Sequence, residues 1–480
     1  MRRCVRGAAS VIALTVIAAL AAQPANAATA ATASSVTVHA GTVLATIRPG
    51  AIGANEPVWN PRLVEPAVPG LIRQAGIGML SFNGGPIADM YHWKDGTLSP
   101  DPDAANHPYD YFTNLPPQFT FDQFATVAQQ ANASMFVHVN YGTGTAQEAA
   151  DWVRYANKVK HLGVKYWTVG EEVWGNGGIP GINFQPDGHA DKSPQAYGRN
   201  FLEFVAAMKA VDPSVKVGVQ LAGIPGGPLH DWDVAVLSTV GHAPDFVDFH
   251  QYPFGQIDHS DAALLAVPRQ IPAKLTALRT LVNQYAGPQV EIVAGETNSA
   301  ALQAPQQITT FNALYLADDM LSLLENGSTS VDWWALHNGG FGATHGDLGL
   351  LSTGDCDETN TICAPPTDTP YPPYYGMQLT GAIARPGGKL LSTASGDSLV
   401  VAHAVCEPDG SLAVLLINDD PANAKQVSLD LPGYPAGDGA TVLSYAQGST
   451  GVSVTHESGP VNAVRTLAPY SLTELILHRA

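Results

Sequence analysis

The chain has 480 residues, of which 45% are hydrophobic and 14% charged, a balance that excludes an intrinsically disordered protein and fits a large globular one. The length predicts two or three domains. The 42 Asp and Glu outnumber the 23 Lys and Arg, and such an acidic surface repels nucleic acid and anionic membranes. We therefore expect neither as a partner, and the sequence leaves the oligomeric state open.

The first 27 residues have the features of a signal peptide. Arg2, Arg3 and Arg6 precede an apolar run over residues 8–22, and Ala25-Asn26-Ala27 follows as an A-x-A cleavage site. We expect cleavage near Ala27 and a secreted, extracellular protein. An uncleaved membrane anchor is the alternative, although the run is shorter than the ~20 residues of a membrane span.

Three cysteines follow this segment. Cys356 and Cys363 bracket a polar loop, and in an exported protein we expect them to form a disulfide. Cys406 lies in an apolar run that is typical of a strand, and we expect it to be a buried, free thiol. No spacing of Cys and His indicates a zinc site.

Residues 28–49 form an N-terminal segment in which 35–46 has the pattern of a strand, and this strand could join a C-terminal β-module. From residue 50 to 384, β-rich runs alternate with amphipathic helical ones. Eight such runs end near these residues: Asn55, Asn83, Asn140, Glu172, Ala222, Tyr252, Glu296 and His337. Eight βα units over about 300 residues predict a (β/α)8 TIM barrel rather than a doubly wound sheet.

Two of the intervening helices are particularly clear. Residues 193–212 begin at Ser193-Pro194 and have one apolar face. Residues 310–326 have an apolar side and end before Gly327. From 385 to 480, short alternating runs separated by Gly, Pro, Asn and Asp predict an antiparallel β-sandwich domain.

Two of the eight β-runs end in acids. The fourth ends at Glu171-Glu172 and the seventh at Glu296, each after an apolar run and a glycine. Active sites of TIM barrels lie at the carboxyl ends of the strands, so these acids would face one another across the mouth. Two facing carboxylates are the requirement of glycoside hydrolysis. The alternative is that they are solvated loop acids.

The surrounding residues resemble a known family. Trp167-Thr168-Val169-Gly170-Glu171-Glu172 looks like the Trp-x-x-Gly-Asn-Glu signature of clan A retaining glycosidases, and 295–298 resembles their strand-seven nucleophile segment. The chain is most similar to glycoside hydrolase family 51, the α-L-arabinofuranosidases. Further matching segments are Gly84-Gly85 to Trp93, 139–145 with the helix at 148–153, and His250-Gln251-Tyr252.

The resemblance implies a role for each matching residue. Glu172 would be the general acid/base and Glu296 the nucleophile. Tyr252 would hydrogen-bond Glu296, while His250, Asn140 and Asn298 would line the sugar subsite. This mechanism uses carboxylates and water alone, so we expect no metal and no organic cofactor.

The chain departs from the family pattern at two positions. Glu171 stands where the clan has an Asn whose amide meets the sugar 2-hydroxyl, and we expect Glu171 to contact substrate. Ser81-Phe82-Asn83-Gly84-Gly85 stands where Arg-x-Pro-Gly-Gly is expected, so an Arg that would help to keep the nucleophile ionised is missing.

Several other residues are candidates for sugar contacts. Trp59, Trp93, Trp174, Trp333 and Trp334 could stack on sugar rings, although any one Trp is more often part of the core. Trp174 is the favoured contact because it follows Glu172 on a Gly-rich loop. Glu56 closes the first β-run and is a further candidate, with a loop acid as the alternative.

We therefore expect a secreted retaining glycosidase of polysaccharides or oligosaccharides, with α-L-arabinofuranosides as the leading substrate. The alternatives are a β-xylosidase, a β-glucuronidase or another furanosidase of the same clan, and a non-catalytic carbohydrate-binding protein built on a silenced barrel. Motifs of serine hydrolases, zinc peptidases and phosphate-binding loops are absent from the sequence.

Overall fold

The computed structural model describes residues 33–107, 115–253, 259–357 and 359–480. The expected signal peptide lies outside these residues. Ala33–Ala480 forms one compact unit.

Eight parallel strands close into a barrel, which confirms the predicted (β/α)8 fold. Their order around the barrel is β2-β3-β6-β7-β10-β11-β12-β13, with β13 pairing β2. The bounds are Ile52–Glu56, Met79–Phe82, Ser134–Val139, Tyr166–Val169, Lys216–Leu221, Phe246–Gln251, Glu291–Thr297 and Ser328–Trp333. Each of the predicted β-runs thus corresponds to one strand.

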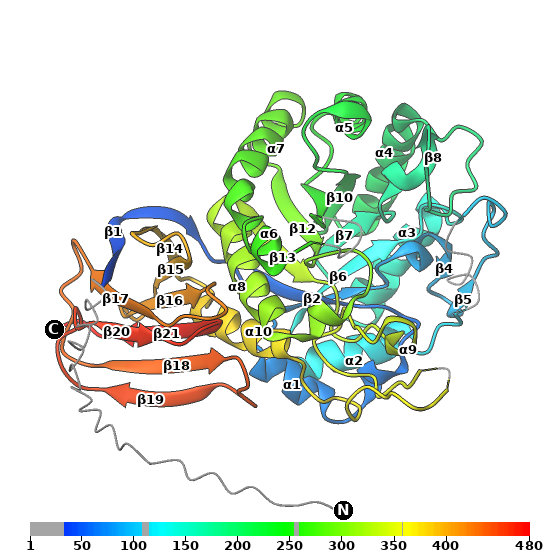
Figure 1. Ribbon diagram of the computed structural model, residues 1–480. Helices are drawn as coiled ribbons and strands as arrows, with labels where there is room; N and C mark the ends of the chain where they lie inside the picture. The colour runs from blue at the N-terminus through cyan, green and yellow to red at the C-terminus, as the bar shows by residue number, and fades with distance from the viewer. Residues whose placement is uncertain (1–32, 108–114, 254–258, 358) are drawn as a thin grey trace, which may run out of the picture. The chain divides into compact units, whose positions relative to one another are not determined.

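Helices surround these strands (Figure 1). They are α1 (Val68–Gln74), α2 (Phe121–Ala131), α3 (Ala146–Val153), α4 (Pro194–Val211), α5 (Gly227–Val240), α6 (Asp261–Leu265), α7 (Ile271–Tyr285), α8 (Thr310–Glu325), α9 (Phe341–Thr344) and α10 (Pro372–Ile383). Ser193 caps α4 by accepting a hydrogen bond from the Ala196 N–H. Two short hairpins, β4 (Tyr91–His92) with β5 (Thr97–Leu98) and β8 (Asn176–Ile179) with β9 (Ile182–Asn183), extend from the loops.

The strand sequences fill the barrel in layers. Met79, Phe136, Phe246 and Val293 form one apolar cluster. Two residues further along their strands stand Ser81, His138, Asp248 and Gly295, and side chains two apart in a strand point to the same face. The layer next to the mouth is therefore polar, and it is this layer that meets the carboxyl ends of the strands.

The remaining large sheet has nine strands in the order β19-β18-β21-β16-β15-β14-β1-β17-β20. Its strands are β1 (Ser34–Thr46), β14 (Lys389–Ser395), β15 (Val400–Cys406), β16 (Leu412–Asn418), β17 (Lys425–Asp430), β18 (Ala440–Ala446), β19 (Ser453–Glu457), β20 (Arg465–Leu467) and β21 (Ser471–Leu477). The N-terminal β1 lies beside β14 and β17, as Figure 1 shows, pairing β14 antiparallel and β17 parallel. The parallel pairing of β1 with β17 departs from the predicted antiparallel sandwich. It is possible because β1 comes from the other end of the chain and is not joined to β17 by a hairpin.

This β-module is apolar on both faces. Val414 and Leu416 of β16 belong to its inner cluster, whereas Leu415 and Ile417 belong to the same hydrophobic cluster as the barrel helices. Helix α8 is buried on nearly all sides, not on one side as the sequence pattern predicts, because the barrel, α10 and the β-module all contact it. The expected boundary between residues 384 and 385 falls between α10 and β14 and stays a prediction.

Two further expectations concern sulfur. Cys356 and Cys363 form the expected disulfide. Cys406 is a free thiol but only partly buried, since it is the last residue of β15. Within the described residues, no helix is long and apolar enough to cross a membrane.

Candidate active site

The two consecutive acids after β7 lie at different depths. Gly170 and Glu172 both have a positive φ, 82° and 38°, so the chain turns sharply between the strand and the 3₁₀ turn Val173–Gly175. As a result the Glu171 side chain is buried, with 1% exposure, while that of Glu172 is 18% exposed at the mouth. The turn separates two acids that are neighbours in sequence.

Glu296, near the end of β12, is the third carboxylate. Tyr252 donates a hydrogen bond from its hydroxyl to Oε2 of Glu296 at 2.8 Å. The next residue, Thr297, is anchored by a 2.7 Å hydrogen bond from its hydroxyl to Asp319 on α8. Tyr252, which follows β11, therefore holds the Glu296 carboxylate, and Thr297 anchors the backbone next to it.

His250 of β11 joins the three acids. Its Nδ1 lies 2.9 Å from Oε1 of Glu172, 3.5 Å from Oε2 of Glu296 and 3.7 Å from Oε1 of Glu171. Burial lowers the pKa of His250, but the three carboxylates outweigh burial and raise it well above its ordinary value. His250 is thus an imidazolium that supplies positive charge where the expected Arg is missing.

Burial raises the pKa of both buried acids. That of Glu171 rises to about 8, and the His250 cation opposes the rise. Burial also raises the pKa of Glu296, with the charges of Glu171 and Glu172 acting in the same direction and His250 against it. The cluster therefore holds more acids than its one cation can neutralise, and a proton is retained among them.

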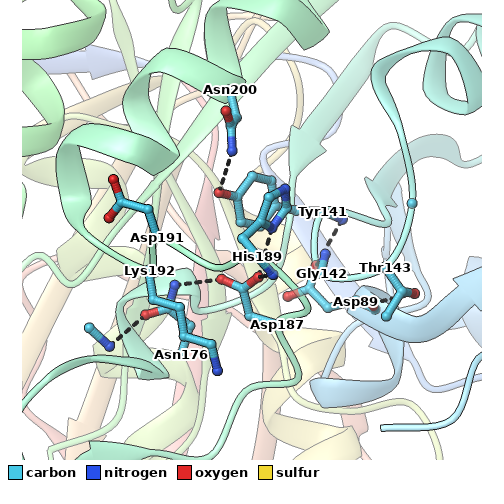
Figure 2. A network of polar contacts seen from close by, with 12 residues as sticks. Asp89, Tyr141, Gly142, Thr143, Asn176, Asp187, His189, Asp191, Lys192 and Asn200 are labelled. Atoms are coloured by element: carbon cyan, nitrogen blue, oxygen red, sulfur yellow. Dashed lines mark hydrogen bonds and ion pairs between the residues drawn. The ribbon is translucent and has the colours of Figure 1, made fainter. Parts of the chain in front are cut away.

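A buried carboxyl group, Asp89, anchors the loops beside Glu171. Its Oδ1 accepts hydrogen bonds from the N–H groups of Tyr141 and Gly142, and its Oδ2 accepts from the N–H of Glu171 at 3.1 Å. Figure 2 shows the network that continues from this turn, with Asp187 bonded to Asn176 and His189. The loops after β6 and β7 are thereby fixed to one another.

Three predicted contact residues make hydrogen bonds within the protein, and their contact with substrate stays a prediction. Asn140 bonds the backbone of Tyr91 and its own loop, where its Oδ1 accepts from Thr143 and Gly144. The amide of Asn298 donates to the Trp334 carbonyl at 2.6 Å. Glu56 is fully buried and accepts from the N–H of His337. These side chains shape the loops around the carboxylates.

Two of the five tryptophans lie beside the nucleophile candidate. A Cβ on Gly84 would come within 3.2 Å of Oε1 of Glu296 and 2.8 Å of the Trp334 ring, and one on Gly85 would touch Trp59. The Trp59 and Trp334 ring centroids are 5.8 Å apart. Trp174, the favoured contact, is partly buried and packs edge-on against Phe184, and its contact with sugar stays a prediction. Trp93 stacks on Trp152, and Trp333 is core. The Gly84-Gly85 turn is therefore needed for the close approach of the backbone.

Sequence reasoning missed one residue of this cluster, His138 on β6. Its Nε2 lies 2.9 Å from the Ser81 hydroxyl, and its Nδ1 lies 2.6 Å from Oε2 of Glu171. Burial lowers the pKa of His138 to about 4, so the ring is neutral. The two positions that depart from the family pattern, Ser81 and Glu171, are thus linked through one histidine.

Glu171, His250 and Glu296 each place a polar atom within 4.8 Å of the others. Carboxylates and imidazoles can in general bind a cation. Among the described residues, no other group of three His, Cys, Asp or Glu side chains brings its ligand atoms this close together. The pKa of His250 is raised well above its ordinary value, and a protonated imidazole has no lone pair for a metal ion. We therefore assign no metal to this group, and the expectation of a metal-free enzyme stays a prediction.

The geometry can be compared with known proteins. The chain combines a TIM barrel with a β-module, and solved structures of glycoside hydrolases have the same fold. An α-L-arabinofuranosidase from Thermotoga maritima in complex with arabinose matches 92% of this chain and 100% of its own, with a TM-score of 0.71 and 18% identity. A family 51 α-L-arabinofuranosidase from Bifidobacterium longum covers 93% of the chain at a TM-score of 0.68 and 16% identity.

Curated relatives match over shorter stretches. A probable α-L-arabinofuranosidase C from Aspergillus fumigatus is 26% identical over 161 residues, 30% of each chain. An intracellular exo-α-(1→5)-L-arabinofuranosidase from Acetivibrio thermocellus is 24% identical over 237 residues, 46% of this chain and 44% of its own. The chain thus aligns with less than half the length of these relatives, and no protein-family model matches it. It resembles clan A glycoside hydrolases of family 51.

Proposed function

We propose that this chain is a retaining glycoside hydrolase that cleaves α-L-arabinofuranosides. The observation that carries the proposal is the position of His250, whose Nδ1 lies 2.9 Å from an oxygen of Glu172 and 3.5 Å from one of Glu296. The two carboxylates therefore face one imidazole from two sides of the barrel mouth. This arrangement supports a pair about as close as the roughly 5 to 5.5 Å that a retaining mechanism needs.

The residues then have the following roles. Glu296 attacks the anomeric carbon while the bond to the leaving oxygen breaks, and Glu172 donates its proton to that oxygen. Glu172, now a carboxylate, takes a proton from a water molecule, whose oxygen bonds to the anomeric carbon as the bond between that carbon and Glu296 breaks. Tyr252 and His250 stabilise the charge of Glu296 before attack and after release.

The choice of arabinofuranose rests on the relatives and neighbours named above, which are arabinofuranosidases. A barrel that had lost its catalytic activity would have no need to keep Glu172 and Glu296 both close to the His250 imidazole. The C-terminal module offers little support for polymer binding, because Tyr434, Tyr445 and Tyr470 are all buried.

The test is hydrolysis of aryl glycosides by the purified protein, with arabinofuranoside, xyloside, glucuronide, galactoside and glucoside compared. We expect turnover of the arabinofuranoside with retention of anomeric configuration, observed by NMR of the first-formed product. The Glu296→Ala protein is the control and should be inactive. No turnover of any glycoside or polymer would contradict the proposal.

We also propose that the protein is exported, on the strength of residues 1–27. Amino-terminal sequencing of the protein from culture medium tests this, and a mature start at Ala28 is expected.

A further inference from the structure

The strand that carries Glu296 has an extra residue just before it. Side chains alternate along a strand, so successive residues point to opposite faces. Val293 of β12 belongs to the apolar cluster inside the barrel, whereas Ala294 belongs to the hydrophobic cluster that includes the barrel helices. Continued alternation would point Gly295 inward and Glu296 outward, away from the mouth.

A β-bulge at Gly295 reverses this direction. In the pairing of β12 with β11, Phe249 lies opposite Ala294. The next residue of β11, His250, lies opposite Glu296, so Gly295 is the inserted residue. The register of β12 with β13 also shifts after Ala294. Bulges of this kind re-aim side chains next to active sites. Glu296 therefore points to the same face as His250, whose Nδ1 lies 3.5 Å from its Oε2.

The side chain of Asn55 holds this bulge from a strand that is not its neighbour. Its Nδ2 donates a hydrogen bond to the Gly295 carbonyl at 2.8 Å, and both residues are buried. Asn55 belongs to β2, and β13 lies between β2 and β12 in the barrel. Asn55 is itself fixed, because its carbonyl accepts a hydrogen bond from the N–H of Leu336 at 2.8 Å. The residue inserted by a bulge is left outside the ladder, and here a side chain supplies the donor for its carbonyl.

Two close approaches restrict the bulge further. A Cβ on Gly295 would lie 2.2 Å from Oδ1 of Asp248, so the inserted residue has to be a glycine. A Cβ on Gly84 would lie 3.1 Å from Oδ1 of Asn55 and 3.2 Å from Oε1 of Glu296. The amide of Asn55 and the carboxylate of Glu296 thus pack against the same turn.

We propose that Asn55 is a positioning residue, which fixes the bulge at Gly295 and so keeps the Glu296 carboxylate pointing into the mouth. Its side chain is fully buried and its amide donates to the protein backbone, so its effect on the reaction passes through Glu296. The 2.8 Å hydrogen bond from Tyr252 depends on the same orientation of the carboxylate. The inference rests on the proposed function, in which Glu296 is the nucleophile.

The first experiment compares the wild type with Asn55→Ala on a 2,4-dinitrophenyl arabinofuranoside, whose leaving group needs no proton. A reacting group displaced by about 1 Å can cost about 10²-fold, so kcat/KM, which reports the attack by Glu296, should fall about 100-fold. The same kcat/KM in Asn55→Ala and wild type would overturn the inference.

The matched control is Asn418→Ala. Asn418 is also a fully buried asparagine, at the end of β16, and its Nδ2 donates to the backbone carbonyl of Ala468 at 2.7 Å. Because it lies in the β-module, its substitution should lower the melting temperature and leave kcat/KM unchanged. The control separates a loss of stability from a loss of positioning.

The second experiment asks whether the effect passes through Glu296. In Glu296→Ala, added azide takes the place of the carboxylate, and its nitrogen bonds to the anomeric carbon as the bond to dinitrophenolate breaks. Azide is not attached to β12, so adding Asn55→Ala to Glu296→Ala should change the azide-dependent rate by less than about threefold. A further loss near 100-fold would show that Asn55 acts on the sugar or on the whole fold, and would overturn the inference.

A crystal structure of Asn55→Ala gives a readout that does not depend on turnover. We expect the Glu296 carboxylate to lie more than about 3.5 Å from the Tyr252 hydroxyl, beyond hydrogen-bonding distance, with the barrel otherwise unchanged. An intact hydrogen bond would overturn the inference even if the arabinofuranoside is hydrolysed. A displaced carboxylate in the variant of a protein that hydrolyses no glycoside would instead contradict the proposed function.

Discussion

Tyr252 donates a hydrogen bond to Oε2 of Glu296 across 2.8 Å, from the loop that follows β11 to the end of the neighbouring strand β12. Burial and the charge of Glu296 raise the pKa of Tyr252 well above its ordinary value, so the hydroxyl stays a donor. The bond fixes the carboxylate and stabilises its charge.

Removing this hydroxyl should therefore slow the reaction. A hydrogen bond to a charged group contributes about 1.5 to 3 kcal/mol, so Tyr252→Phe should lower kcat/KM by roughly 10- to 100-fold. Steady-state kinetics on an aryl arabinofuranoside measures this. Tyr375→Phe, which loses a surface bond to the Thr450 carbonyl, is the control and should be unaffected. A change of less than twofold in Tyr252→Phe would count against the nucleophile assignment.

The two catalytic acids should respond differently to the leaving group. Glu172→Ala should lower kcat by about 10² to 10⁴ on substrates with poor leaving groups, but much less on a dinitrophenyl glycoside. Glu296→Ala should abolish both activities. Glu203→Ala, on the exposed face of α4, serves as the control. Equal losses on both substrates in Glu172→Ala would refute its role as the acid.

Asp89 should matter for stability as much as for activity. Asp89→Ala leaves the N–H groups of Tyr141, Gly142 and Glu171 without their acceptor, and each buried donor left unpaired costs about 1 to 3 kcal/mol. We expect a fall of several degrees in melting temperature, measured by calorimetry. Asp151→Ala, an exposed aspartate on α3, should melt like the wild type. An unchanged melting temperature in Asp89→Ala would show that the loops hold without it.

The contact between α8 and the β-module should depend on pH. His403 of β15 lies 2.8 Å from Glu325 and 3.2 Å from Asp318. Burial lowers the pKa of His403, but the two carboxylates outweigh burial and raise it from 6.5 to about 10. Because the folded pKa is the higher one, this stabilisation is complete below pH 6.5 and is lost as the pH rises from 6.5 to 10.

Urea unfolding at pH 6 and pH 9 measures that loss. The wild type should lose a larger part of its free energy of unfolding between these values than His403→Gln does. His456→Gln, on the exposed strand β19, should behave like the wild type. The same pH dependence in His403→Gln and wild type would assign the effect to other groups.

The sequence by itself determined the barrel and its two acids. Each β-run became one strand because apolar runs of that length, separated by amphipathic helices, have few other ways to bury their surface. Since the carboxyl ends of parallel strands share one edge, Glu172 and Glu296 had to lie at one mouth. The alternating apolar and polar residues of β1 likewise predicted a strand that could join the C-terminal strands, and β1 pairs with β14.

Only the tertiary structure decided what surrounds those acids. Ser81 and His138 are 57 residues apart, and their contact depends on the stagger of β3 against β6 inside the barrel. Asn140 and Asn298 carry amides that can bond substrate or backbone, and the backbone bonds that they make depend on the loop conformation. Polar side chains have several possible partners, so their pairing is settled by packing, whereas apolar periodicity has essentially one solution.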